Sequence, residues 1–330
     1  MILIVSKEYE KTTIHILEQI DYLGLLYQRI NREDAVEVKN IIINNNQIDV
    51  KIYNMNSKEN IDFNNITAFY CRKGNISYKL NTNHLESISE NKQKHILKHL
   101  QTEWLTIQSF LFQELHRKKC FSDYEKVDMN KLHQLFLAKK CDIDIPNSLV
   151  STQKKSLQKF QNNHQNNVIN KSIQNYFDFV INPYHYFNYT EKVEPTHIEN
   201  LEENFFSSLL QENLQKLYEL RIFFINNDLY ASAIFSQSHQ NTSIDWRKST
   251  EKSKVIRFVP YTLPSEIKTN ILKFINLSGL NTGSIDMIVT KNKKYYFLEV
   301  NPSGEFLEMS KSCNYFLDKK VVEFLKSDVL

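Results

Sequence analysis

The stretch from residue 283 to residue 306, GSIDMIVTKNKKYYFLEVNPSGEF, constrains the fold of this chain more than any other. β-Branched and aromatic residues dominate the runs 284–290 and 295–300, and the polar residues 291–294 separate these runs. Such runs favour extended strands, and a short polar segment between them favours a turn. The stretch therefore predicts a β-hairpin.

Two carboxylates face each other across this hairpin if its turn is centred between Asn292 and Lys293. That register pairs Asp286 with Glu299, and Asn301 shares their face because strand side chains repeat every two residues. Facing carboxylates repel, a cation between them relieves the repulsion, and unpaired charges are rare inside apolar runs such as these. We therefore predict a Mg²⁺ site at these three residues; the alternative is a solvent-facing polar edge that carries two acids.

Composition excludes several classes of protein. At 330 residues, of which 41% are hydrophobic, the chain is long enough for several packed subdomains. A net charge of +3 does not indicate nucleic-acid binding. The four cysteines form no CxxC pair, so neither a disulfide framework nor a structural zinc site is expected. No run approaches the roughly eighteen apolar residues of a membrane span, and we expect a soluble cytoplasmic protein.

Glycine is scarce, with five residues, and neither GxxxxGK[ST] nor GxGxxG occurs. Any nucleotide must therefore be held without a glycine-rich loop. Residues 1–80 alternate as strand, helix and strands, which is typical of an α/β domain. Arg72, Lys73 and Gly74 follow the last of these strands, where open α/β sheets commonly bind ligands; an ordinary solvated turn is the alternative.

The rest of the chain mixes helices and strands. Hydrophobic spacing and turn residues predict helices over 83–118, 130–140, 153–163, 264–277 and 313–326, strands over 147–151, 168–173 and from 205, a hairpin over 219–236, and a loop or lid over 172–200. Lys171 stands inside one of these strands. It is either a phosphate-binding lysine or an edge-strand charge that discourages pairing.

This order of features resembles the ATP-grasp superfamily, in which a nucleotide is clamped between two α+β subdomains without a glycine-rich loop. The resemblance implies a fold of the α+β or α/β class: an N-terminal pre-ATP-grasp α/β domain over 1–124, a central subdomain over 125–212 and a C-terminal subdomain over 213–330. The implied roles are ATP phosphate contacts for Lys131 and Lys171, an adenine-facing backbone at Glu212, Asn213 and Leu214, a ribose contact for Glu219, and Mg²⁺ donors at Asp286, Glu299 and Asn301.

The strings FSQ, IDWR, VPY, LNTGSIDMI, FLEVNPSGEF and CNYFL narrow the resemblance to the maturases of grasp-with-spasm peptide systems, relatives of the microviridin ligases. Such enzymes are implied to use ATP and Mg²⁺ to phosphorylate Asp or Glu side chains of a ribosomally made acidic precursor peptide. Cyclisation onto Ser, Thr or Lys then gives the ω-ester or ω-amide macrocycles of graspetides. A homodimer is also implied.

Arg221 and Arg247 are our candidates to orient the acidic peptide, because planar guanidinium groups suit carboxylates and acyl phosphates; surface salt bridging is the alternative. Asp245 is expected to orient Arg247 or to deprotonate the nucleophile, and Arg257 is a weaker substrate candidate. Two other functions stay open. One is a ligase that adds amino acids, of the ribosomal-protein-glutamate-ligase or glutathione-synthetase type, and the other is a non-catalytic ATP-binding regulator.

Overall fold

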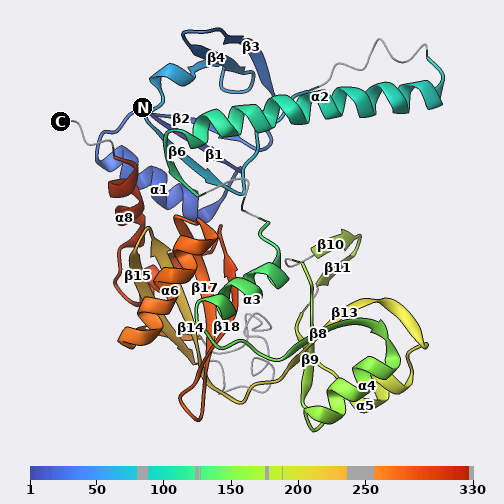
Figure 1. The fold of residues 1–330 in the computed structure, drawn as a ribbon. Helices are drawn as coiled ribbons and strands as arrows, with labels where there is room; N and C mark the ends of the chain where they lie inside the picture. The colour runs from blue at the N-terminus through green and yellow to red at the C-terminus, as the bar shows by residue number, and fades with distance from the viewer. Residues whose placement is uncertain are drawn as a thin grey trace. The chain divides into compact units, whose positions relative to one another are not determined.

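The computed structural model describes residues 1–79, 88–122, 126, 128–174, 178–187, 189–235 and 256–326. The chain forms two compact units. The first consists of residues 1–127 and 316–330, and the second consists of residues 128–315 (Figure 1). None of the helices in the described ranges is long and apolar enough to cross a membrane.

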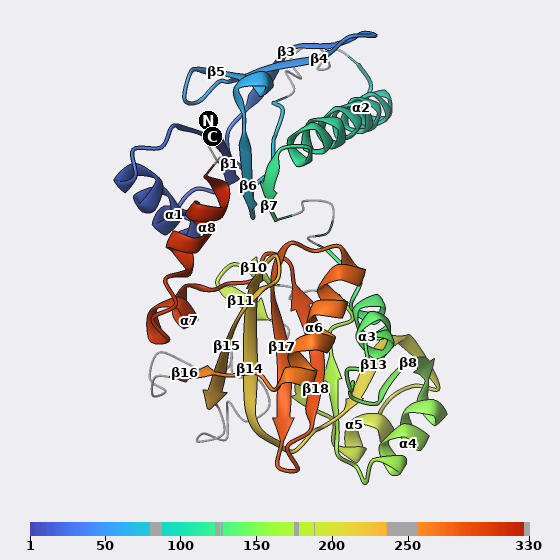
Figure 2. The same ribbon diagram turned by 60° about the vertical axis from the view of Figure 1, so that its left-hand side comes forward.

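The first unit is built on a parallel sheet with the strand order β2-β1-β6-β7. Its elements are β1 (Ile2–Ser6), α1 (Lys11–Tyr22), β2 (Tyr27–Asn31), β6 (Ala68–Arg72), α2 (Glu90–His116), β7 (Lys119–Phe121) and α8 (Leu317–Leu325). Every residue of β1 is buried, as expected for an inner strand covered on both faces. Helices α1 and α8 lie side by side (Figure 2). This sheet confirms the α/β pattern expected near the N-terminus.

A separate antiparallel sheet completes the first unit. It consists of β3 (Val36–Ile43), β4 (Ile48–Asn54) and β5 (Glu59–Asp62), followed by the short 3₁₀ helix η1 (Phe63–Asn65). The β3–β4 pair is the hairpin that the apolar and polar runs of this region favour.

The second unit contains a four-stranded sheet of order β12-β9-β13-β8, a β10–β11 hairpin and a five-stranded sheet of order β16-β15-β14-β17-β18. Its elements are α3 (Lys131–Lys140), β8 (Ser148–Gln153), α4 (Lys154–Asn163), β9 (Val168–Lys171), β10 (Asp178–Ile181), β11 (Tyr184–Phe187), β12 (Glu191–Lys192), α5 (Pro195–Glu199), β13 (Asn204–Glu212), β14 (Lys216–Ile225), β15 (Asp228–Phe235), β16 (Arg257–Tyr261), α6 (Ser265–Ser278), β17 (Thr282–Thr290), β18 (Tyr295–Asn301) and α7 (Leu307–Ser312). The chain passes from one sheet to the other between β13 and β14. The boundary between two subdomains at residue 212 stays a prediction.

One face of the five-stranded sheet is apolar, and the other face carries charged side chains beside buried apolar ones such as Phe223. Alternate residues of β14, β17 and β18 form a hydrophobic core with α3 and α6, which lie on one side of the sheet (Figure 2). The members of this core include Leu220, Ile222, Ile285, Met287, Phe297, Leu135, Ile271 and Phe274. The intervening residues, among them Arg221 and Asp286, point to the opposite face because strand side chains alternate. The functional candidates lie on this second face.

Two sequence-based expectations are wrong. Residues 172–200 are not simply a loop, because their described part contains β10, β11, β12 and α5; the Asn, Tyr and His residues there hide the strand pattern. The helix expected over 313–326 is also broken. Helix α7 ends at Ser312 and α8 begins at Leu317, because Asn314 and Phe316 have left-handed φ angles of 53° and 52°, which an α-helix cannot accommodate.

Candidate nucleotide and metal site

The predicted hairpin is present, and Asp286 lies directly opposite Glu299. Nearer the turn, Met287 pairs with Phe297, so the turn is centred on Asn292 and not between Asn292 and Lys293. Leu298 is the extra residue of a β-bulge between these two pairs, and it restores the expected register at the acids. The predicted pairing is therefore confirmed, although a bulge produces it.

Strand β14 adds a cation to this pair. Arg221 lies opposite Asp286 on the other side of β17, so Arg221, Asp286 and Glu299 form one row across three strands. Arg221 is 9% exposed; its Nη1 lies 3.3 Å from Asp286 Oδ1, and its Nε donates to the Glu305 carbonyl at 3.2 Å. At the other end of the row, the Lys131 ammonium at the start of α3 lies 2.9 Å from Glu299 Oε2. The two acids are thus flanked by two cations, and we call these four residues the charged row.

The environment of Asp286 disfavours its negative charge. Burial raises the pKa of Asp286 to about 6, the Arg221 guanidinium opposes this rise, and the Glu299 and Glu219 carboxylates add to it. The Lys171 ammonium makes the smallest contribution and lowers this pKa. A bound cation would relieve the repulsion between the two acids.

The donor set fits Mg²⁺. Within the described ranges no group of three or more His, Cys, Asp and Glu residues is arranged to hold a metal ion. The site offers instead the carboxylates of Asp286 and Glu299 and the amide of Asn301. Mg²⁺ is commonly bound by one or two carboxylates together with substrate phosphates and water. Oxygen donors without thiol or imidazole therefore favour a hard cation shared with a phosphate ligand.

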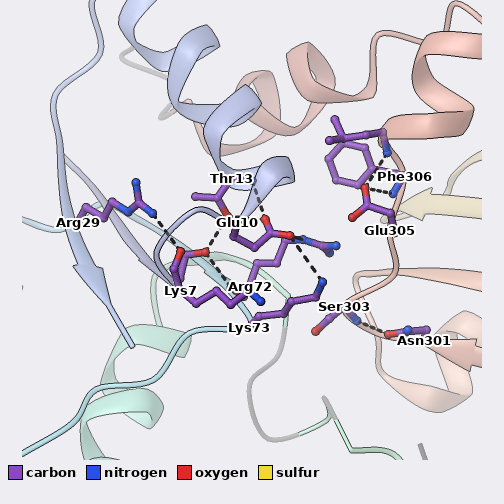
Figure 3. Close-up of polar contacts among 12 residues, drawn as sticks. Lys7, Glu10, Thr13, Arg29, Arg72, Lys73, Asn301, Ser303, Glu305 and Phe306 are labelled. Carbon is purple, nitrogen blue, oxygen red and sulfur yellow. Dashed lines mark hydrogen bonds and ion pairs between the residues drawn. The ribbon is translucent and has the colours of Figure 1, made fainter. Parts of the chain in front are cut away.

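The turn after β18 positions Asn301 and the Glu305 carbonyl, which accepts a hydrogen bond from Arg221. Asn301 pairs with Ser284, and its Oδ1 accepts the Ser303 N–H at 3.0 Å (Figure 3). A Cβ on Gly304 would lie 2.2 Å from Ser284 Oγ, so only glycine fits the turn at this point. The next residue, Glu305, supplies the carbonyl that binds Arg221. The sequence Asn301-Pro302-Ser303-Gly304 predicts a turn that ends the strand, and β18 does end at Asn301.

Lys171 is the last residue of β9 and pairs with Leu209 of β13. Strand β9 lies between β12 and β13, although β12 pairs only with Ile169 and Asn170. The strand pairing of Lys171 is thus on its β13 side, so both explanations of this lysine, a phosphate contact and an edge-strand charge, stay open. Its effect on the pKa of Asp286 supports a role at the charged row.

The expected adenine-facing segment lies between the two sheets of the second unit. Glu212 ends β13, and its Oε2 accepts Asn147 Nδ2 at 2.9 Å. The N–H of Asn213 donates to the Asn167 carbonyl, and Asn167 Nδ2 donates back to the Asn213 carbonyl, each at 2.9 Å. Asn167 engages both backbone groups of Asn213, and the Glu212 N–H donates to the Asn147 carbonyl at 3.0 Å, so the half-buried Leu214 is the better candidate to face a base.

Glu219 lies on the same strand face as Arg221 and is buried. Its carboxylate forms an ion pair with Lys216, a residue that sequence reasoning did not identify. Arg257 is exposed at the start of β16. Asp245 and Arg247 lie outside the described residues, so their roles stay predictions.

Known proteins share this architecture. The macrocyclase MdnC from Microcystis aeruginosa MRC, bound with its precursor peptide MdnA, is 25% identical with a TM-score of 0.78, covering 98% of this chain and 99% of that chain. A RiPP-associated ATP-grasp ligase from Chryseobacterium gregarium, solved with ADP and leader and core peptide, is 22% identical with a TM-score of 0.75, covering 98% and 94%. The ATP-grasp ligase PsnB, solved with a phosphomimetic precursor variant, Mg and ADP, is 16% identical with a TM-score of 0.67, covering 98% and 97%.

No curated protein matches the sequence significantly. The sequence does match the RimK-like ATP-grasp domain over residues 127–325, which is more than half of the chain. This range includes the whole charged row and both sheets of the second unit. The chain therefore belongs to the RimK-like ATP-grasp domain family.

Proposed function

We propose that this protein is an ATP-dependent peptide ligase. It activates Asp or Glu side-chain carboxylates of a ribosomally made acidic precursor as acyl phosphates. It then joins them to Thr or Ser as ω-esters, or to Lys as ω-amides, and releases ADP and phosphate. The observation that carries this proposal is the charged row, because it combines paired oxygen donors with flanking cations in a chain that resembles a macrocyclase along its full length.

A carboxylate is a poor electrophile, and ATP with Mg²⁺ supplies the phosphoryl group that converts it into a reactive acyl phosphate. Asp286, Glu299 and Asn301 would hold the metal ion. Lys131 and Lys171 would neutralise phosphate oxygens, because an ammonium is a compact point charge. Fixed charges of this kind are the main catalytic contribution of the protein in phosphoryl transfer.

Arg221 takes a more specific role than the sequence predicts. Its guanidinium is already committed to Asp286 and to the Glu305 carbonyl, and it lowers the pKa of Asp286. Arg221 would therefore keep Asp286 ionised and aligned, in addition to any contact with the peptide. Orientation of the acidic peptide is then assigned mainly to Arg247, with Asp245 holding that arginine.

Three further expectations are part of the proposal. The family resemblance implies ω-ester or ω-amide bonds and leaves both open. The homodimer rests on the same resemblance, and light scattering of the purified chain tests it. The four free cysteines suit a reducing compartment such as the cytoplasm.

Mass spectrometry separates the candidate functions. The purified protein is incubated with ATP, Mg²⁺ and an acidic precursor peptide encoded beside its gene. The Asp228→Asn variant, which changes an exposed acid of the five-stranded sheet outside the charged row, is a control and should act like wild type. Cyclisation removes one water for each bond formed, whereas an amino-acid ligase adds a residue mass. An unchanged peptide mass with ATP bound and no ADP formed would favour a non-catalytic regulator and contradict the proposal.

A further inference from the structure

The carboxyl edge of the parallel sheet in the first unit carries a group of basic residues. Lys7 follows β1, Arg32 follows β2 and Lys73 follows β6 directly, and these three strands are neighbours in the sheet. Because the strands are parallel, the three residues meet at one edge. We call these residues, together with the last residue of β6, Arg72, the basic edge. Open sheets of parallel strands bind ligands at this edge.

The backbone at Lys73 forms a tight turn against the end of β1. Lys73 has a left-handed φ of 53°, which costs about 1 kcal/mol for a residue with a side chain. It forms a bridge with Ser6 at the end of β1. A Cβ on Gly74 would lie 2.4 Å from Ser6 N and 2.4 Å from the Val5 carbonyl carbon. Only glycine permits this close turn, so the turn fixes Lys73 at the sheet edge.

The Glu10 carboxylate forms ion pairs with two residues of the basic edge, Arg72 and Lys73. Its buried carboxylate accepts the N–H and the hydroxyl of Thr13 at Oε2, at 2.7 and 2.9 Å. Its Oε1 faces Arg72 Nε at 3.2 Å and Lys73 Nζ at 3.7 Å (Figure 3). Burial acts to raise the pKa of Glu10, but Arg72, Thr13 and Lys73 outweigh it and keep the carboxylate ionised. One carboxylate therefore faces two positive charges.

Exposure distinguishes the two cations that share Glu10. Arg72 is 4% exposed, whereas the Lys73 side chain is 49% exposed. Arg32 and Lys7 are exposed as well, and both lower the pKa of the nearby Glu33. Of the two cations that share Glu10, Lys73 is thus the one with access to solvent.

We infer that the basic edge binds carboxylate side chains of an acidic peptide, with Lys73 as the contacting ammonium and Glu10 and Gly74 as the residues that position it. The inference rests on the proposed function, because that function makes an acidic peptide the substrate. It adds a substrate-binding residue in the first unit, separate in the chain from the nucleotide and metal residues of the second unit.

Fluorescence anisotropy tests this inference on the full chain. The probes are a labelled peptide of alternating Thr and Glu residues and its counterpart with Gln in place of Glu. Lys73→Ala should weaken binding of the Glu peptide about tenfold, as expected for loss of a hydrogen bond to a charged group, and Lys73→Arg should restore most of it. Lys58→Ala is the matched control, because Lys58 is an exposed lysine of the same unit with a φ of 58°.

The outcomes separate the inference from the proposed function. If the wild-type protein prefers the Glu peptide and Lys73→Ala alone loses that preference, the inference is supported. If both alanine variants keep the wild-type preference, the basic edge is a structural feature and the inference is overturned, while the proposed function stands. If the wild-type protein binds the two peptides equally, the acidic substrate itself is wrong and the inference fails with it.

Discussion

Without metal and nucleotide, the free energy of unfolding of the wild-type protein should fall as the pH rises, because Asp286 must lose its proton. Replacing Asp286 by Asn should remove this pH dependence. Burial raises the pKa of Asp286 from 3.8 to about 6 in the folded protein. The folded state therefore binds this proton more tightly than the unfolded chain does. Stabilisation by this proton is complete below about pH 4, and it is lost as the pH rises through about 6.

The expected size follows from the same shift. About two pKa units at roughly 1.4 kcal/mol each correspond to about 3 kcal/mol. The Asp286 side chain is 22% exposed, so solvent screens this contribution only weakly. Between about pH 4 and pH 7 the free energy of unfolding of Asp286→Asn should therefore rise by about 3 kcal/mol relative to wild type.

Urea unfolding of the two proteins across this pH range measures the difference directly. The low pKa of Glu10 gives a pH dependence of opposite sign, because its stabilisation is lost as the pH falls. Both proteins carry Glu10, so its contribution cancels in the difference. A difference that stays constant with pH would show that Asp286 has an ordinary pKa, and it would refute the electrostatic description of the charged row.

Three further substitutions test individual residues. Glu299→Gln should lower turnover at least about a hundredfold with the fold intact, because a charged metal donor is lost; activity like that of wild type would remove the metal assignment. Lys171→Ala should weaken ATP binding, measured by calorimetry, about tenfold or more. Lys192→Ala, in the same sheet, is the control and should bind ATP like wild type. If the two variants bind ATP with equal affinity, Lys171 is a structural charge. Gly304→Ala should cost about 1–3 kcal/mol in urea unfolding, because its Cβ would lie 2.2 Å from Ser284 Oγ. Adding Ser284→Gly should recover part of this loss, and no recovery would contradict the proposed clash.

The metal-binding part of the site could be predicted because it is local. Asp286 and Glu299 belong to one hairpin, so strand periodicity and a short polar turn bring them together without information from the rest of the chain. Even there the predicted turn centre was off by half a residue, and the bulge at Leu298 compensates for this difference. Bulges depend on packing across the sheet, and the amino-acid pattern alone does not indicate them.

The rest of the charged row depends on contacts between distant segments. Arg221 meets Asp286 because β14 pairs with β17, and two strands and a helix separate these strands in the chain. Lys131 was expected at phosphate oxygens, and its ion pair with Glu299 arises because α3 packs against β18. Periodicity describes each segment separately, so it could not predict that these side chains form one row.

The central claim is that the charged row serves a reaction in which ATP cleavage drives ring formation in an acidic peptide. The most direct measurement follows ADP release and peptide mass in one reaction with the wild-type protein, Mg²⁺ and the precursor peptide. The account predicts that ADP formed and water lost from the peptide increase together in equal molar amounts. ADP release without loss of water, or a peptide that gains the mass of an amino acid, would contradict it.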